Sequence, residues 1–233
     1  YKGKKIKFFT LLINIVFWVP IYGQASEFSG VRYSLGSASG TFKFSSNDVL
    51  DGDFDHNLSG VAFGASYIKS DNDKLLIGGG FERVNVAGKK TPSKDQISGY
   101  WTYSHSTYGY FDVDLMVNGY YTTFFYGLIG YNMSISEKMY FQPNVRLGLK
   151  SIIATWTEDI DWNSYTDQSL KYSENVSGFG LGIELPLIYK FKENMAGGLN
   201  LCICGTSAEF TTGSYKYNFY SSNVMNLLFD YYF

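Results

Sequence analysis

The feature that most constrains the fold is a long segment, VSGFGLGIELPLIYKF at residues 176–191, in which apolar side chains alternate with small or polar ones. Phe179 and Leu181 belong to the apolar series, whereas Gly180 and Glu184 belong to the other. Successive side chains of a β-strand point to opposite faces, so the segment predicts a strand with one apolar face. Strands of soluble proteins usually have about 3–10 residues. A longer strand is more typical of one that crosses a membrane and continues into water.

The same alternation recurs in other parts of the chain. We expect the apolar series to face outward and the polar or small series to face the interior, which is the arrangement of a transmembrane β-barrel. A secreted soluble β-sandwich is the alternative, and a broad apolar belt on the folded surface would exclude it. The other alternating runs contain Tyr33, Phe63, Leu147 and Leu201.

Three short polar turns, at 70–74, 136–138 and 192–194, alternate with four longer polar stretches. Short turns on one side and long loops on the other are typical of outer-membrane barrels. Seven connections predict a closed, antiparallel, up-and-down barrel of eight strands. We expect the strands near 29–44, 58–70, 74–87, 109–133, 139–155, 174–191, 196–210 and 217–233.

The fourth predicted strand has a second interpretation. Its Asn118-Gly119 dipeptide is typical of a tight hairpin turn, which would split the segment and give ten strands. One apolar series runs through the dipeptide from Phe111 to Met133 without interruption, however. That continuity favours eight strands over ten.

Composition supports an all-β protein and excludes one class of partner. Aromatic residues make up 19% of the chain, with 25 glycines and 4 prolines. The formal net charge is −2, whereas a nucleic-acid partner requires a basic surface that neutralises phosphates. We therefore expect no nucleic-acid binding.

The first residues predict a secretory signal peptide. Four lysines precede the apolar run FFTLLINIVFWV, and the small residues Gly23 and Ala25 follow it. The run is short against the ~20 residues of a membrane-spanning helix. We predict a signal peptide over 1–25 and a barrel domain over 26–233, in which no apolar run reaches the length of a spanning helix.

The closing residues NLLFDYYF place Phe229, Tyr231 and Phe233 at every second position, up to the last residue. Together with the leader and the alternating strands, this ending resembles the small bacterial outer-membrane β-barrels of the OmpA and OmpX type. The resemblance implies a location in the outer membrane of a Gram-negative bacterium, in contact with its lipid and lipopolysaccharide. It also implies that the barrel-assembly machinery recognises the terminal aromatic strand, that the protein is a monomer, and that it needs no cofactor.

Six charged residues are expected to point into the barrel. Glu82, Arg146 and Glu184 each lie about eight residues from a short turn. Because a strand rises ~3.3 Å per residue, these three residues should lie at the same height in the barrel and contact one another. An eight-stranded barrel is only wide enough for side chains, which favours a buried network of ion pairs. A constricted path for ions or solutes is the alternative. The predicted inward charges are Arg32, Glu82, Arg146, Lys150, Glu184 and Lys190.

Catalytic and metal-binding interpretations are weaker. Deacylases on this scaffold carry a His and a Ser two residues apart, but His105 is followed two residues later by Thr107. Asp51, Asp53 and Asp55 begin like a calcium loop, yet His56 occupies the position of the required glycine. We therefore predict no catalytic residue and no metal site.

Cys202 and Cys204 share the predicted inward face. Adjacent same-face strand positions lie near the upper limit of the Cα spacing of a disulfide, and their Cβ vectors are parallel, so a bridge between these two residues would be strained. We expect two thiols that fill space in the lumen. The overall prediction is a non-enzymatic barrel with a structural or surface-interaction role; the alternative is a narrow pore or transporter for small or apolar solutes.

Overall fold

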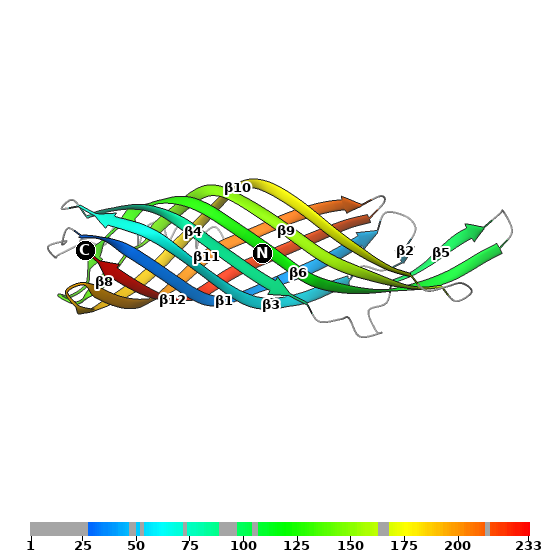
Figure 1. Cartoon of the computed structure of the whole chain (residues 1–233), viewed down its shortest axis with the longest axis horizontal. Coiled ribbons are helices and arrows are strands. Elements are labelled where there is room, and N and C mark those ends of the chain that lie inside the picture. The colour runs from blue at the N-terminus through cyan, green and yellow to red at the C-terminus, as the bar shows by residue number, and fades with distance from the viewer. Residues whose placement is uncertain are drawn as a thin grey trace, which may run out of the picture.

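The structure is a computed structural model that describes residues 28–46, 50–51, 54–71, 74–88, 97–103, 107–162, 168–212 and 215–233. All of its regular elements in these ranges are β-strands (Figure 1). Among the same residues there is no helix of a length and apolarity sufficient to cross a membrane. The predicted signal peptide lies outside the described residues.

Eight long strands form a closed ring in which each strand is antiparallel to its neighbours. The last strand pairs with the first, so the predicted up-and-down barrel is confirmed and a β-sandwich is excluded. In ring order the strands are β1 (Phe28–Ser46), β3 (Phe54–Ser70), β4 (Leu75–Ala87), β6 (Thr107–Tyr131), β9 (Asn144–Trp162), β10 (Gln168–Lys192), β11 (Met195–Thr212) and β12 (Tyr215–Tyr232).

Four shorter strands extend the ring. β7 (Met133–Ser134) and β8 (Met139–Phe141) lie at the end with the short turns, and β8 pairs with β10 next to β9. At the opposite end from the C-terminus, β5 (Ile97–Tyr103) pairs with the start of β6, and β2 (Leu50–Asp51) pairs with β5 (Figure 1). β8 thus continues the wall next to β9, whereas β5 and the start of β6 extend beyond the other long strands (Figure 1).

The alternative of ten strands is wrong, because β6 is continuous through the Asn118-Gly119 dipeptide. The register against β9 shifts between Val117 and Gly119, so Asn118 forms a β-bulge. Its side-chain Nδ2 donates a hydrogen bond to Thr157 Oγ1 at 2.6 Å. The dipeptide is therefore accommodated within a strand instead of turning the chain.

Several strands are longer at the loop end than the sequence predicts. The segment 158–175 was expected to be largely loop, yet β9 continues to Trp162 and β10 starts at Gln168. There Lys171 lies opposite Thr157 and Ser173 lies opposite Thr155. The outward positions here are polar, whereas Tyr172 and Trp156 on the inward face stack on each other, so the alternation of hydrophobicity is reversed relative to the apolar part of the strands.

The ring closes through the predicted pairing of its terminal strands. Val31 lies opposite Tyr231 and Leu35 opposite Leu227. The backbone N–H of Phe233 donates a hydrogen bond to the carbonyl of Ser29 at 3.0 Å. The pairing therefore continues to the last residue and leaves no open sheet edge at this end of the barrel.

A belt of exposed apolar side chains surrounds the barrel, which confirms the predicted orientation of the alternating strands. Phe179, Leu181, Leu187, Phe191, Leu147 and Leu201, which belong to the apolar series of their strands, are exposed, and Leu185 of the same series is half-buried. We define the apolar belt as Tyr33, Leu35, Val61, Phe63, Tyr67, Ile77, Phe81, Phe125, Ile129, Tyr131, Val145, Leu147, Leu149, Phe179, Leu181, Leu187, Tyr189, Leu199, Leu201, Ile203, Met225, Leu227, Phe229 and Tyr231.

Candidate functional site

A charged cluster occupies the middle of the barrel interior. Arg146 Nη1 on β9 lies 3.2 Å from Glu82 Oε2 on β4 and 3.5 Å from Glu184 Oε1 on β10. Its guanidinium also lies over the ring of Tyr126, at 4.6 Å from the ring centroid. All three charged side chains are buried. The structure therefore brings together the three residues that the sequence places at one height.

Lys150 lies beside this cluster. Its Nζ is 4.8 Å from the centroid of the Phe124 ring, and its aliphatic stem packs over Gly180. Besides its ion pair with Arg146, Glu184 Oε1 accepts a hydrogen bond from Asn200 Nδ2 at 2.7 Å. Polar contacts of this kind offset the free-energy cost of burying charges away from water.

Arg32 belongs to a separate ion pair closer to the short turns. Its Nε and Nη2 donate to Oδ1 and Oδ2 of Asp230, at 2.8 and 2.6 Å. Nη2 also donates to Gln142, whose Nε2 donates to Asn132 Oδ1 at 2.9 Å. The sequence analysis missed Asp230, although its parity, opposite to that of Phe229 and Tyr231, places it inside the barrel.

Lys190 is not part of either charged group. It is half-buried near the short turns, and its Nζ lies 5.9 Å from the centroid of the Tyr232 ring. Both residues line a pocket of about 300 Å³ at this end of the barrel. The remaining lining residues are Phe28, Tyr140, Gln142, Glu193, Asn194 and Phe233.

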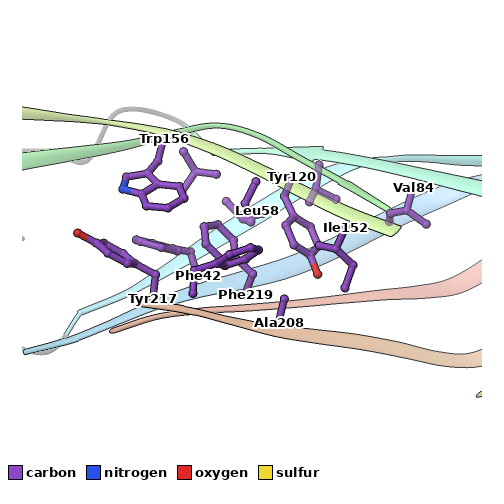
Figure 2. Close-up of a cluster of buried hydrophobic side chains, with 14 of the residues drawn as sticks. Phe42, Leu58, Val84, Tyr120, Ile152, Trp156, Ala208, Tyr217 and Phe219 are labelled. Carbon is purple, nitrogen blue, oxygen red and sulfur yellow. The ribbon is translucent and has the colours of Figure 1, made fainter. Parts of the chain in front are cut away.

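An aromatic cluster fills the interior at the loop end of the barrel (Figure 2). The ring centroids of Trp156 and Tyr217 are 4.7 Å apart, and the stacked rings of Tyr120 and Phe219 have centroids 5.2 Å apart. The sequence analysis missed this cluster. It could have been recognised in the sequence from aromatic residues at inward-facing alternate positions, on strands that extend past the apolar belt. The cluster consists of Phe42, Tyr120, Trp156, Phe210, Tyr217 and Phe219, packed with smaller apolar residues.

The aromatic cluster holds one buried carboxylate, that of Glu158. Tyr217 donates its hydroxyl to Glu158 Oε1, and Trp156 Nε1 donates to the same oxygen at 3.2 Å. These residues lie beyond the apolar belt. Burial and the adjacent carboxylate raise the pKa of Tyr217, so its hydroxyl stays protonated and continues to donate.

The prediction of two free thiols is wrong, because Cys202 takes part in a disulfide bond. Cys204 is the only other cysteine in the sequence. The objection to a bridge assumed a regular strand, but the register of β11 against β12 shifts between Leu201 and Cys204. An irregular ladder changes the directions of neighbouring side chains. Arg146 Nη2 donates to the sulfur of Cys202 at 3.4 Å.

Some predicted positions cannot be placed. Asp53 and His105 lie outside the described residues, as do the side chains of Asp51, Asp55 and His56. Within the part of the chain that the structure describes, no three His, Cys, Asp or Glu side chains gather where they could hold a metal ion.

The fold and the interior together define a closed, eight-stranded β-barrel with an apolar outer surface and charged and aromatic clusters inside. The chain is similar to Ail, the attachment invasion locus protein of Yersinia pestis, with 15% identity over 90% of this chain and 100% of that one, at a TM-score of 0.36. It is also similar to the outer membrane protein OprG from Pseudomonas aeruginosa, with 13% identity over 90% of this chain and 98% of that one, at a TM-score of 0.45. A third similar structure is the outer membrane protease OmpT from Escherichia coli, with 11% identity over 92% of this chain and 99% of that one, at a TM-score of 0.36. No protein-family model and no curated protein sequence matches the chain.

Proposed function

We propose that the protein is a non-enzymatic outer-membrane β-barrel with a structural and surface-interaction role. The observation that carries the proposal is the combination of an apolar exterior with an interior filled by side chains. Apolar surface of this extent on a soluble protein would promote association, whereas lipid acyl chains cover it at no such cost. Export by the predicted signal peptide over 1–25 and insertion of the 26–233 domain as a monomer complete the proposal.

Closure of the ring supports a membrane location. In hydrocarbon an unpaired backbone N–H or C=O costs several kcal/mol, so strands cross a membrane only as closed barrels. Here β12 pairs with β1 over the whole height of the belt, and β10 pairs with β11 up to Ile183 and Ile203 in its upper part. Outer-membrane lipid, lipopolysaccharide and the barrel-assembly machinery are the partners that such a barrel requires.

Two layers of side chains favour a sealed lumen and argue against an open pore. The Arg146 cluster crosses the middle of the barrel, and the aromatic cluster crosses it nearer the loops. Large members of both, such as Arg146, Trp156 and Phe219, are almost fully buried. The narrow pore remains the alternative function, because charged residues also line conduction paths.

Planar-bilayer recording on refolded protein separates the two functions. A sealed barrel should give no discrete conductance steps, while a porin inserted under the same conditions provides the positive control. Stepwise conductance through the wild-type protein would contradict the sealed lumen and favour the pore.

The surface-interaction role rests on the strands that continue past the belt. β6 and β10 each contain 25 residues, whereas about 9–11 residues suffice for a membrane-crossing strand. β5 pairs with the outer part of β6 and lengthens this projection (Figure 1). Protease treatment of intact cells tests the orientation: the loops at this end should be cleaved while the short turns stay protected.

A further inference from the structure

The wall of the barrel separates between β10 and β11. These strands pair from Lys192 and Met195 up to Ile183 and Ile203, and within the described residues the ladder ends there. β10 continues to Gln168 paired only with β9, and β11 continues to Thr212 paired only with β12. Figure 1 shows the two strands diverging toward the loop end.

Residues on the inner face of β10 are exposed along this separation. Val176 has the inward parity of the strand but is 38% exposed, whereas its partner Ile152 on β9 is 5% exposed. A Cβ built on Gly178 meets no described atom within 4 Å. The interior can therefore be reached from the side at this height.

The opening begins inside the apolar belt. Phe179, at its β10 edge, is 86% exposed, and Leu181 and Ile203 flank its base at 60% and 50%. Above Phe179 the outward residues of β10 become polar, starting with Ser177. In the membrane proposed above, the base of the opening faces acyl chains and its upper part faces the surface.

Glycines on the inner face of β10 leave room beside the opening, and the Lys150 side chain fills part of that room. Glycines occupy inner positions 178, 180 and 182 of β10, and a Cβ at Gly180 would lie 2.5 Å from Lys150 Cε. The disulfide-bonded Cys202, which accepts a hydrogen bond from Arg146, lies where β11 leaves β10. Behind the opening the apolar residues Ile152, Ala208, Tyr120 and Phe219 lie close together (Figure 2). Two charged residues flank this apolar patch: Lys150 lies opposite Gly178, and Glu174 lies on the inner face of β10 beyond Val176.

We propose that this opening is a lateral binding site for the hydrocarbon chain of an outer-leaflet lipid. The chain enters from the belt between Phe179 and Ile203 and lies against Val176 and Ile152, at the flank of the aromatic cluster. Continuity with the belt favours this occupant, since acyl chains are what the base of the opening meets and Val176 and Ile152 offer them apolar contacts between the charged Lys150 and Glu174. The inference rests on the membrane location in the proposed function and adds a ligand that the sealed barrel does not require.

Tryptophan reporters and lipids with brominated acyl chains test the site, because bromine quenches tryptophan fluorescence at short range. Val176→Trp places a reporter inside the opening, and Ser177→Trp places one on the outer face above the belt. Leu181→Trp provides a reporter in the belt itself. Each variant is refolded into vesicles whose lipids carry bromine near the glycerol end of the chains, and its insertion is checked by heat-modifiable migration.

A bound chain should quench the Val176→Trp signal, after subtraction of the wild-type signal, about as strongly as the Leu181→Trp signal and more than the Ser177→Trp signal. Adding Gly178→Phe, for which the structure has space, should restore the Val176→Trp fluorescence. Unquenched emission at long wavelength would mean that water occupies the opening, and unquenched emission at short wavelength would mean that a protein segment or a second copy covers it. Either result overturns the inference, whereas an unquenched Leu181→Trp would instead overturn the membrane location.

Discussion

Arg32 and Asp230 lie directly opposite each other on the first and last strands, and their side chains form two hydrogen bonds of 2.8 and 2.6 Å inside the barrel. Two parallel bonds between guanidinium and carboxylate fix the relative position of the two strands as well as neutralising the charges. The pair therefore specifies the register in which the barrel closes.

Arg32→Met should lower the free energy of unfolding by about 3–5 kcal/mol, because it leaves the Asp230 carboxylate buried without its partner. Arg32→Met with Asp230→Leu should cost less than the sum of the single changes. Urea unfolding in lipid vesicles, followed by gel shift, measures both. The matched control is the exposed pair of Lys216 and Glu209, where Lys216→Met should cost less than about 1 kcal/mol.

The Arg146 cluster should show the same non-additivity. Arg146→Met alone strands Glu82 and Glu184 in the interior and should cost about 3–5 kcal/mol. Combining it with Glu82→Gln should recover part of that loss. A double-mutant cycle on unfolding free energies measures the coupling. Strictly additive losses would indicate that water screens these charges, and would favour a pore.

The belt can be tested from the outside. Leu181→Arg should cost about 2–4 kcal/mol if the residue lies deep in the membrane, and less if it lies near the interface. Ser207→Arg, on an exposed strand position above the belt, should have little effect. Unfolding in vesicles measures both changes, and equal effects would argue against a lipid-facing belt.

Tyr217→Phe removes a hydrogen bond to the buried Glu158 carboxylate and should cost about 1.5–3 kcal/mol. Tyr220→Phe, at an exposed position of the same strand, should stay within about 0.5 kcal/mol.

The Tyr217 hydroxyl also predicts a pH dependence. Its raised pKa means that folding favours the protonated form, so its contribution to stability is complete below about pH 10 and is lost as the pH rises further. The unfolding free energy of the wild type should therefore fall more steeply above that pH than that of Tyr217→Phe. Parallel curves would show that Tyr217 ionises normally in the folded barrel.

Deleting Phe233 should leave export intact but lower the fraction of heat-modifiable barrel in the outer membrane. Aromatic side chains anchor strand ends at the membrane interface, and Phe233 is exposed at the end of β12. Replacing the exposed Ile135, at a short turn, with Ser is the control for a general loss of apolar surface. If the two changes have equal effects, the terminal residue has no special part in assembly.

The sequence predicts the fold well where a strand has two different faces. Leu147 and Arg146, or Leu181 and Gly182, reveal both the strand and its orientation. Above the belt the alternation is inverted, because Ser173 and Lys171 are polar outward residues whereas Tyr172 is an aromatic inward residue. A search for strands with an apolar outer face does not find this part. The bulge at Asn118 depends on the partner strand β9 and has no local signature that separates it from a turn.

The sequence predicts which charged side chains face the interior, but only some of their contacts. Parity places Arg146, Glu82 and Glu184 inside, and their equal distance from the short turns places them together. Which partner Arg32 selects depends on the stagger of β1 against β12, and that is a property of the closed ring. The divergence of β10 from β11 is likewise a relation between two strands, and neither strand shows it alone.

The contact between Arg32 and Asp230 joins residues 198 positions apart in the chain. Contacts of such separation form late, because a long loop must close before they contribute any stabilisation. Translation completes β1 long before it completes β12, so the pairing of the two strands has to wait for the end of synthesis. Until β12 arrives, β1 and β11 each present an unsatisfied edge that would recruit any available strand. In the proposed export and assembly, these two edges would have to be kept from pairing with other strands until β12 is available to close the ring.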